Sequence, residues 1–468
     1  MESTPSPRLP ASAIVAALVV ATVASSVVLS RRHDPWSDIV QQADMVAATL
    51  SSDAMATQRA RGETYTRLIA ALSTRDAPLG ALVRAVILTH VRRQAVGTQQ
   101  ASRNIHVLLS RLPSAPTRLS APVRAATLRW VSALYATPEI PITMDRAPDL
   151  VRDVDATPLG WFRPLARERL AERVGDASGA QRWRAVSHDA SNRRAGRLTG
   201  VASVVVLLCV IGVVTWIMFL VMRAKARRAG VTPEPLVGAR GGEWLLWGLA
   251  GFLASSLALH WLAGWGVHHG LGATRGPVAL SLALQLTASV AGLMVLRRAM
   301  IAGGLRPIDI GIGSSSVATD IRWGLAGYSA MVPLLLPAVC LVQRLLPQLP
   351  DHAHPAVGIA GGNAPAAARV MLFVAAVVVA PIVEEVFFRG VLLNALWART
   401  GRRGVAIAGS AFVFAIIHPQ FYLGWIGVFV IGTVLGIVFV ERRSLLPCIV
   451  LHAVNNCFAL AASRALGD

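Results

Sequence analysis

Residues 370–393 read VMLFVAAVVVAPIVEEVFFRGVLL, an apolar run broken by three charged side chains. An α-helix crosses the hydrocarbon core of a bilayer with about 20 mostly apolar residues, so this run predicts a transmembrane helix. The three charged residues are Glu384, Glu385 and Arg389. Ionisable side chains at membrane depth cost about 2.5–3.5 kcal/mol each on insertion scales, which makes them candidates for function. We therefore expect a polar site inside the membrane.

Similar apolar runs are distributed along the chain. They lie at residues 11–30, 199–222, 244–263, 277–296, 323–343, 366–385, 404–418, 421–440 and 445–463. With 54% hydrophobic and 15% charged residues, the composition excludes an ordinary soluble enzyme, which has roughly 25% charged residues. It also excludes a disordered chain, which would be polar. The predicted fold class is all-α: a polytopic transmembrane helical bundle of about 8–9 spans.

The net charge of +20 comes from 45 basic and 25 acidic residues. In a soluble protein this charge would suggest nucleic acid as a partner, but here arginines cluster in short connections between the apolar runs, as at 223–228, 297–298, 399–403 and 442–443. Such loops belong on the cytoplasmic side. We therefore expect a multi-pass protein of the cytoplasmic membrane, with membrane lipids as partners and no nucleic acid partner.

The runs divide the chain into four parts. Residues 1–30 are predicted to be an uncleaved N-terminal transmembrane anchor. Residues 31–197, rich in arginine, aspartate and alanine and broken by prolines, predict a mainly helical extracytoplasmic domain without a catalytic motif. Residues 198–228 form a transmembrane helix with a basic cytoplasmic end, and residues 240–463 form an intramembrane core whose motifs lie within 366–460. The four cysteines suggest neither a disulfide framework nor a CxxC site.

The first motif is the pair of glutamates in the 370–393 run. Glu385 and Arg389 are four residues apart with the acid first, the favourable orientation for an ion pair on a helix. This pairing would leave Glu384, about 100° around the helix, as the free carboxylate.

Two further motifs lie in later runs. Phe414 and His418 are at i and i+4, and so are His452 and Asn456, so each pair shares a helix face. If the turn lies at residues 401–404, Glu384 and His418 are equally far from it and lie level in an antiparallel helix pair. His452 lies less deep in its helix, so we expect helix tilt to bring it to the same site.

A buried carboxylate beside imidazoles can activate water as a general base. Alternatively, Glu384, His418 and His452 could hold a divalent metal such as zinc with an open position for that water. The amide of Asn456 could donate to a developing oxyanion. The HExxH and GxSxG motifs are absent from the chain. The set therefore indicates amide hydrolysis within the membrane.

The ordered motifs Glu-Glu-x-x-x-Arg, Phe-x-x-x-His and His-x-x-x-Asn resemble the CPBP family of intramembrane proteases. This family includes the type II CAAX prenyl endopeptidases and the bacterial Abi-type self-immunity proteins. The resemblance implies an intramembrane endopeptidase acting on a membrane-associated protein or peptide, and it leaves a metal-bound and a metal-free water equally open. It does not carry over a prenylated substrate, and residues 31–197 are not part of the family core.

The resemblance also assigns roles. Glu384 would activate water together with His418, while His452 and Asn456 would stabilise the oxyanion or complete the site. The catalytic set that it implies consists of Glu384, Glu385, Arg389, His418, His452 and Asn456, with Phe414 in support. Two other functions fit the same residues: a catalytically silent membrane scaffold or peptide-toxin immunity protein, and a proton-coupled transporter that uses buried glutamate and histidine.

Overall fold

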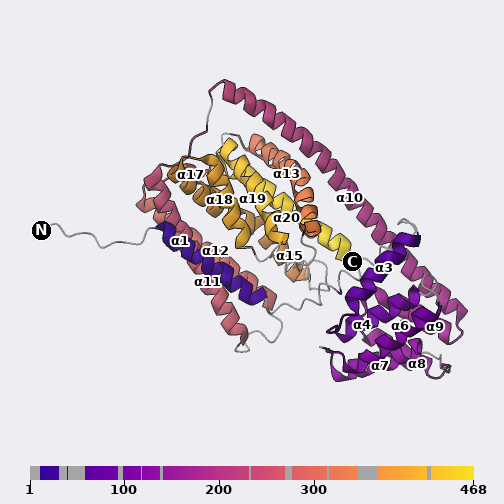
Figure 1. Cartoon of the computed structure of the whole chain (residues 1–468). Coiled ribbons are helices and arrows are strands. Elements are labelled where there is room, and N and C mark those ends of the chain that lie inside the picture. The colour runs from indigo at the N-terminus through magenta and orange to yellow at the C-terminus, as the bar shows by residue number, and fades with distance from the viewer. Residues whose placement is uncertain are drawn as a thin grey trace. The chain divides into compact units, whose positions relative to one another are not determined.

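The computed structural model describes residues 11–30, 40, 58–92, 98–117, 119–136, 141–230, 233–268, 277–313, 316–345, 366–418 and 423–467 (Figure 1). Within these ranges all regular secondary structure is helical, which confirms the all-α fold class. Contacts divide the chain into two compact units: Met1–His33 with Val201–Asp468, and Asp34–Gly200. The predicted domain boundaries at residues 30 and 197 lie beside these divisions. We call the two units the membrane unit and the N-terminal unit.

The N-terminal unit is a cluster of short helices around its own apolar core. The helices are α3 (Gln58–Leu72), α4 (Leu79–Val91), α6 (Thr98–Arg111), α7 (Ala121–Tyr135), α8 (Ala147–Ala156), α9 (Arg163–Arg173) and the start of α10 (Ala177–Arg228), with 3₁₀ turns η1 (Leu112–Ser114) and η2 (Gly160–Phe162). Pro122, Pro148 and Pro164 stand in the first turn of α7, α8 and α9, where a missing backbone N–H costs nothing. The prolines therefore start helices here. Trp130 and Phe162 are fully buried in the core between them.

The membrane unit contains the long helices. They are α1 (Ala11–Ser30), α10 from Val201 onward, α11 (Ala239–His268), α12 (Pro277–Ala302), α13 (Val317–Leu345), α15 (Ala366–Phe373), α16 (Ala380–Glu385), α17 (Asn394–Thr400), α18 (Arg403–Ile416), α19 (Leu423–Arg442) and α20 (Leu446–Gly467), with a 3₁₀ turn η3 (Pro307–Ile310). In Figure 1, α11 lies beside α1 and α12, α18 packs on α19, and α13 packs on α19 and α20.

Five helices of the described residues are long and apolar enough to cross a membrane: Ala177–Arg228, Val317–Leu341, Ala366–Thr400, Gly424–Arg442 and Leu446–Arg464. The other four predicted spans are also helical, as α1, α11, α12 and α18. Of these, Ala11–Thr22 and Arg403–Ile416 are apolar but shorter. The total of eight to nine spans therefore stays a prediction.

The apolar run at 366–385 is the first part of a longer helix. The helix continues from Ala366 to Thr400, through two π-helical segments, η4 (Val374–Val379) and η5 (Val386–Leu393). It ends where Gly401 takes a positive φ of 65° and donates its N–H to the carbonyl of Trp397. The two glutamates do not end the helix, because the charge of Glu385 is paired inside the bundle.

Candidate active site

Glu384 and Glu385 stand at the end of α16, between η4 and η5. A π-helical turn adds a residue to the ordinary helical turn and shifts the faces that follow it, and such turns are frequent at functional sites. The side chain of Glu385 is 0% exposed, whereas that of Glu384 is 24% exposed. The two neighbours therefore lie in different surroundings, one inside the bundle and one at its edge.

Glu385 and Arg389 form a fully buried ion pair, with Arg389 Nη1 2.9 Å from Glu385 Oε1. A buried pair is tolerated only where further contacts compensate the lost hydration of both charges. Arg389 Nη2 donates to the carbonyl of Gly432 at 3.4 Å, and its guanidinium lies 4.4 Å from the centre of the Phe414 ring. The predicted i,i+4 pair thus forms, and it leaves Glu384 outside it.

His452 reaches this pair from α20. Its Nδ1 lies 2.8 Å from Glu385 Oε1, the same oxygen that accepts from Arg389. An ionised carboxylate only accepts hydrogen bonds, so Nδ1 of His452 carries the hydrogen. In the neutral ring, the other nitrogen, Nε2, then presents a lone pair.

His418 is oriented in the same way at the end of α18. Its Nδ1 lies 2.6 Å from the carbonyl oxygen of Phe414, which can only accept, so this nitrogen also carries the hydrogen. The carbonyl of His418 itself accepts from the indole Nε1 of Trp425 at 3.2 Å. These two bonds fix both the ring and its backbone, and they leave Nε2 of His418 with a lone pair.

The two Nε2 atoms face the same carboxylate oxygen. Glu384 Oε2 lies 3.7 Å from Nε2 of His418 and 3.8 Å from Nε2 of His452. Among the described residues this buried oxygen has no hydrogen-bond partner. Both separations are too long for direct hydrogen bonds. In Glu384, His418 and His452, which we call the acceptor triangle, one carboxylate oxygen thus lies near an acceptor nitrogen of each imidazole.

Phe414 forms the apolar wall of the acceptor triangle. Its ring centre lies 4.4 Å from that of His418, 5.9 Å from that of His452 and 5.0 Å from that of Phe388. The same ring covers the Arg389 guanidinium. Because an apolar surface excludes water, it strengthens the electrostatic interactions beside it.

Asn456 lies one turn beyond His452 on α20. Its Nδ2 donates to the carbonyl of Ala376 in η4 at 2.8 Å, and its Oδ1 accepts from Nδ2 of Asn455 at 3.2 Å. The structure thus ties Asn456 to η4 and shows no hydrogen bond from it to the acceptor triangle within the described residues. Its predicted role at an oxyanion stays a prediction.

Several residues that hold the site were not predicted to do so. Trp425 and Ala376 contact it through single hydrogen bonds, which leave no trace in the sequence pattern. The role of Gly432 does leave a signal in the sequence, because Gly432 and Gly436 are four residues apart, a spacing that indicates close helix packing. A Cβ at position 432 would lie 3.0 Å from Cα of Ala411 in α18. This close approach also brings the Gly432 carbonyl to Arg389.

The metal prediction rests on the three residues of the acceptor triangle. Zinc bound at about 2.0–2.1 Å by tetrahedral ligands requires donor atoms about 3.4 Å apart. The two separations from Glu384 Oε2, at 3.7 and 3.8 Å, are longer, and the described residues contain no group of three His, Cys, Asp or Glu arranged to hold a metal ion. In this arrangement the three side chains do not form a metal site, and the divalent metal stays a prediction.

Residues 366–458 match the family described as Type II CAAX prenyl endopeptidase Rce1-like. This segment is thus similar to the Rce1-like domain of that family. The match contains all three motifs, from Glu384 to Asn456, and agrees with the resemblance seen in the sequence. Comparison with curated proteins and with solved structures gives no match.

The segment similar to the Rce1-like domain, together with the five long apolar helices, supports a membrane protein. It occupies the part of the membrane unit formed by α15 to α20. The helices α1, α11, α12 and α13 pack around it but lie outside the match. The match therefore includes the three residues of the acceptor triangle and does not extend to the N-terminal unit.

Proposed function

We propose that the chain is an intramembrane endopeptidase that hydrolyses a peptide bond of a membrane-associated protein or peptide. The observation that carries the proposal is the acceptor triangle: Glu384 Oε2, without a hydrogen-bond partner among the described residues, faces the lone pairs of two imidazoles at 3.7 and 3.8 Å. A carboxylate oxygen and an imidazole nitrogen at such a separation suit a molecule that donates two hydrogens between them, and water is the co-substrate of hydrolysis.

In the proposed reaction, a water donates to Glu384 Oε2 and to Nε2 of one histidine. Glu384 takes a proton as the water oxygen bonds to the carbonyl carbon of the substrate, and the π electrons of the carbonyl move to its oxygen. The proton then passes to the amide nitrogen as the C–N bond breaks, and an amine and a carboxylic acid leave. For the oxyanion we assign the second N–H of Asn456, whose first N–H is held by Ala376.

The test uses purified full-length protein in proteoliposomes with a solubilised membrane-protein extract, and reads new N-termini by mass spectrometry. We expect Glu384→Gln and His418→Ala to abolish the new N-termini, a loss of at least about 100-fold. Glu234→Gln, at an exposed carboxylate outside the Rce1-like domain, is the matched control and should cleave like wild type. Equal cleavage by wild type and Glu384→Gln would overturn the proposal in favour of a non-catalytic scaffold or immunity protein.

We further propose that the protein lies in the cytoplasmic membrane with the N-terminal unit on the outside. The basic connections between the spans support this orientation. In a variant without its four native cysteines, Ser110→Cys and Gly404→Cys would be exposed reporters of the two sides. An impermeant maleimide should label Ser110→Cys in intact cells and Gly404→Cys only after lysis, and the reverse pattern would invert the topology.

A further inference from the structure

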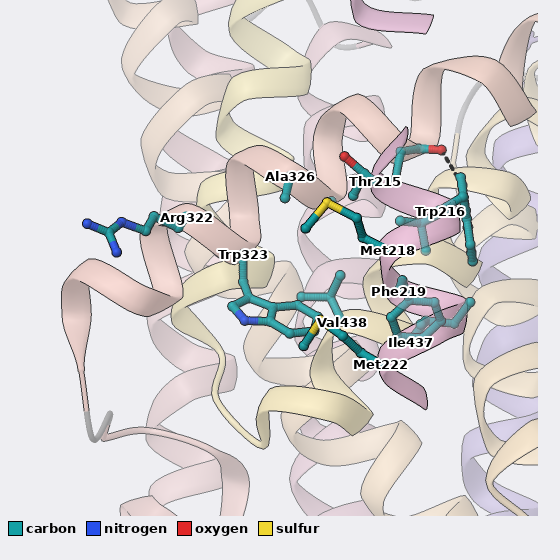
Figure 2. A pocket seen from close by; sticks show the side chains of 13 residues that line it. Thr215, Trp216, Met218, Phe219, Met222, Arg322, Trp323, Ala326, Ile437 and Val438 are labelled. Carbon is teal, nitrogen blue, oxygen red and sulfur yellow. Dashed lines mark hydrogen bonds between the residues drawn. The ribbon is translucent and has the colours of Figure 1, made fainter. Parts of the chain in front are cut away.

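A pocket of ≈ 270 Å³ lies in the membrane unit between α10, α13 and α19. Its wall is almost entirely apolar and rich in aromatic and sulfur-containing side chains. Figure 2 shows Trp323 in the middle of this wall with Phe219, Met222 and Val438 around it. Beside the pocket, Trp216 Nε1 donates a hydrogen bond to the carbonyl of Ala330 at 2.7 Å and so links α10 to α13.

This pocket is separate from the acceptor triangle. On α19 it is lined by Val434, Ile437 and Val438. Gly432 and Gly436 instead face α18, where a Cβ would meet Ala411 and Ile407. The helix α19 thus presents one face to the candidate active site and another to the pocket, and the proposed peptidase reaction does not use the second.

The pocket lies close to the basic end of the unit. On α10, the lining residues from Thr215 to Met222 directly precede the basic run 223–228, and on α19 they come shortly before Arg442. Arg322 belongs to the lining itself. In Figure 2 its side chain extends away from the apolar cluster.

The acidic groups at this end are already engaged. Glu441 pairs with Arg223, and Asp320 accepts two hydrogen bonds from Arg442, at 2.9 and 2.7 Å. Arg322 is exposed and has no ion pair or hydrogen bond within the described part of the chain. The pocket therefore combines an apolar interior with an uncompensated cation at its edge.

We propose that this pocket binds an anionic phospholipid, with one acyl chain among Phe219, Met222 and Trp323 and the headgroup phosphate on Arg322. Basic pockets between transmembrane helices on the cytoplasmic side are suited to anionic headgroups. The apolar wall excludes a polar small molecule, since it offers almost no hydrogen-bonding groups to a buried ligand. The positive charge of Arg322 favours binding of an anionic lipid over a zwitterionic one.

The test measures quenching of tryptophan fluorescence by phospholipids with brominated acyl chains, in proteoliposomes of the full-length protein. The difference between wild type and Trp323→Phe isolates the signal of Trp323. We expect brominated phosphatidylglycerol to quench this signal at an about five-fold lower mole fraction than brominated phosphatidylcholine, the preference that one arginine near the surface gives.

Two variants and a control sharpen the result. Arg322→Gln should remove the preference, whereas Arg298→Gln, at an exposed arginine of α12 outside the pocket, should keep it. Ala326→Leu, which fills the pocket from α13, should reduce quenching by both lipids. Elution as a single peak checks that each variant folds.

Equal quenching by the two lipids, or a preference that survives Arg322→Gln, would overturn the proposal. So would the absence of quenching by either lipid, which would mean that protein fills the pocket. None of these readouts requires peptide cleavage, so the lipid site and the peptidase proposal can fail independently.

Discussion

Glu385 Oε1 and His452 Nδ1, 67 positions apart in the sequence, are joined by a 2.8 Å hydrogen bond inside the bundle. This bond links α16 to α20 and fixes which nitrogen of His452 faces Glu384. The same oxygen compensates the charge of Arg389. Glu385 is therefore a positioning residue, whereas its neighbour Glu384 is the candidate base. The division of labour between the two glutamates leads to the first prediction.

Glu385→Gln should destabilise the protein and Glu384→Gln should not. The first change leaves Arg389 as an uncompensated buried charge, which costs about 3–5 kcal/mol. Glu384 is partly exposed, and its Oε2 has no hydrogen-bond partner among the described residues, so its replacement should stay within about 0.5 kcal/mol. Thermal unfolding in detergent, followed by tryptophan fluorescence, compares the two. Equal unfolding midpoints for the two variants would contradict a buried ion pair between Glu385 and Arg389.

The close contact at Gly432 can be tested with a glycine on the same helix. A Cβ at 432 would lie 3.0 Å from Cα of Ala411, which a backbone atom cannot easily avoid. A Cβ at 427 would meet only side-chain atoms, Leu335 Cδ1 at 3.4 Å and Val339 Cγ2 at 3.9 Å. Alanine is favoured over glycine in a helix by about 1 kcal/mol. We therefore expect Gly427→Ala to raise the unfolding temperature and Gly432→Ala to lower it. If both variants changed the unfolding temperature in the same direction, α18 and α19 would not be held at this distance.

In the N-terminal unit, the buried hydroxyl of Thr157 joins three hydrogen-bonding groups, and we call this set the Thr157 junction. It accepts from Trp130 Nε1 at 3.0 Å, donates to the carbonyl of Asp153 at 2.9 Å and contacts the hydroxyl of Thr127 at 3.1 Å. Thr157→Val keeps the shape but leaves the Trp130 N–H unpaired, which should cost about 1–3 kcal/mol.

Limited proteolysis of the N-terminal unit in the full-length protein measures this effect. Thr199→Val is the control, because among the described residues the Thr199 hydroxyl bonds only to the carbonyl of Ala195 on its own helix. Indistinguishable cleavage rates for the two variants would count against the junction.

Asp176 at the start of α10 gives a pH dependence. Its carboxylate accepts from the backbone N–H of Gly179 and from the hydroxyl of Ser178, both at 2.8 Å. These bonds, the one to Gly179 first, lower the pKa of Asp176 below its ordinary value of 3.8. Because the pKa is lower in the folded state, the contribution is fully present above pH 3.8 and is lost as the pH falls through the folded-state pKa.

Hydrogen exchange at the first amides of α10 measures this contribution. Asp176→Asn can still cap the helix but does not titrate. At neutral pH we expect stronger protection in wild type than in Asp176→Asn, and the difference should vanish at about pH 2. A difference that persists at low pH would mean that the charge of Asp176 plays no part.

The contacts within single helices could be predicted. Glu385 with Arg389, and Phe414 with His418, are each four residues apart, and helical geometry alone brings such side chains together. The turn at Gly401 could be predicted as well. Because a short connection forces adjacent helices to run antiparallel, that turn also predicts that Glu384 and His418 lie at the same height in the two helices. The helix of the first motif extends beyond the apolar run at 366–385 to Thr400, as the turn predicted at 401–404 implies.

The all-α membrane fold, the three motifs and the pairing of Glu385 with Arg389 follow from the amino-acid sequence alone, since apolar runs and i,i+4 spacing are local properties. Three further contacts follow only from the folded chain: Glu385 holds His452, Gly432 supplies a carbonyl to Arg389, and α10, α13 and α19 enclose a pocket edged by Arg322. These contacts depend on how far each helix is rotated and shifted against its neighbours. The π-helical turns around Glu384 change that rotation, and no spacing along the chain encodes it.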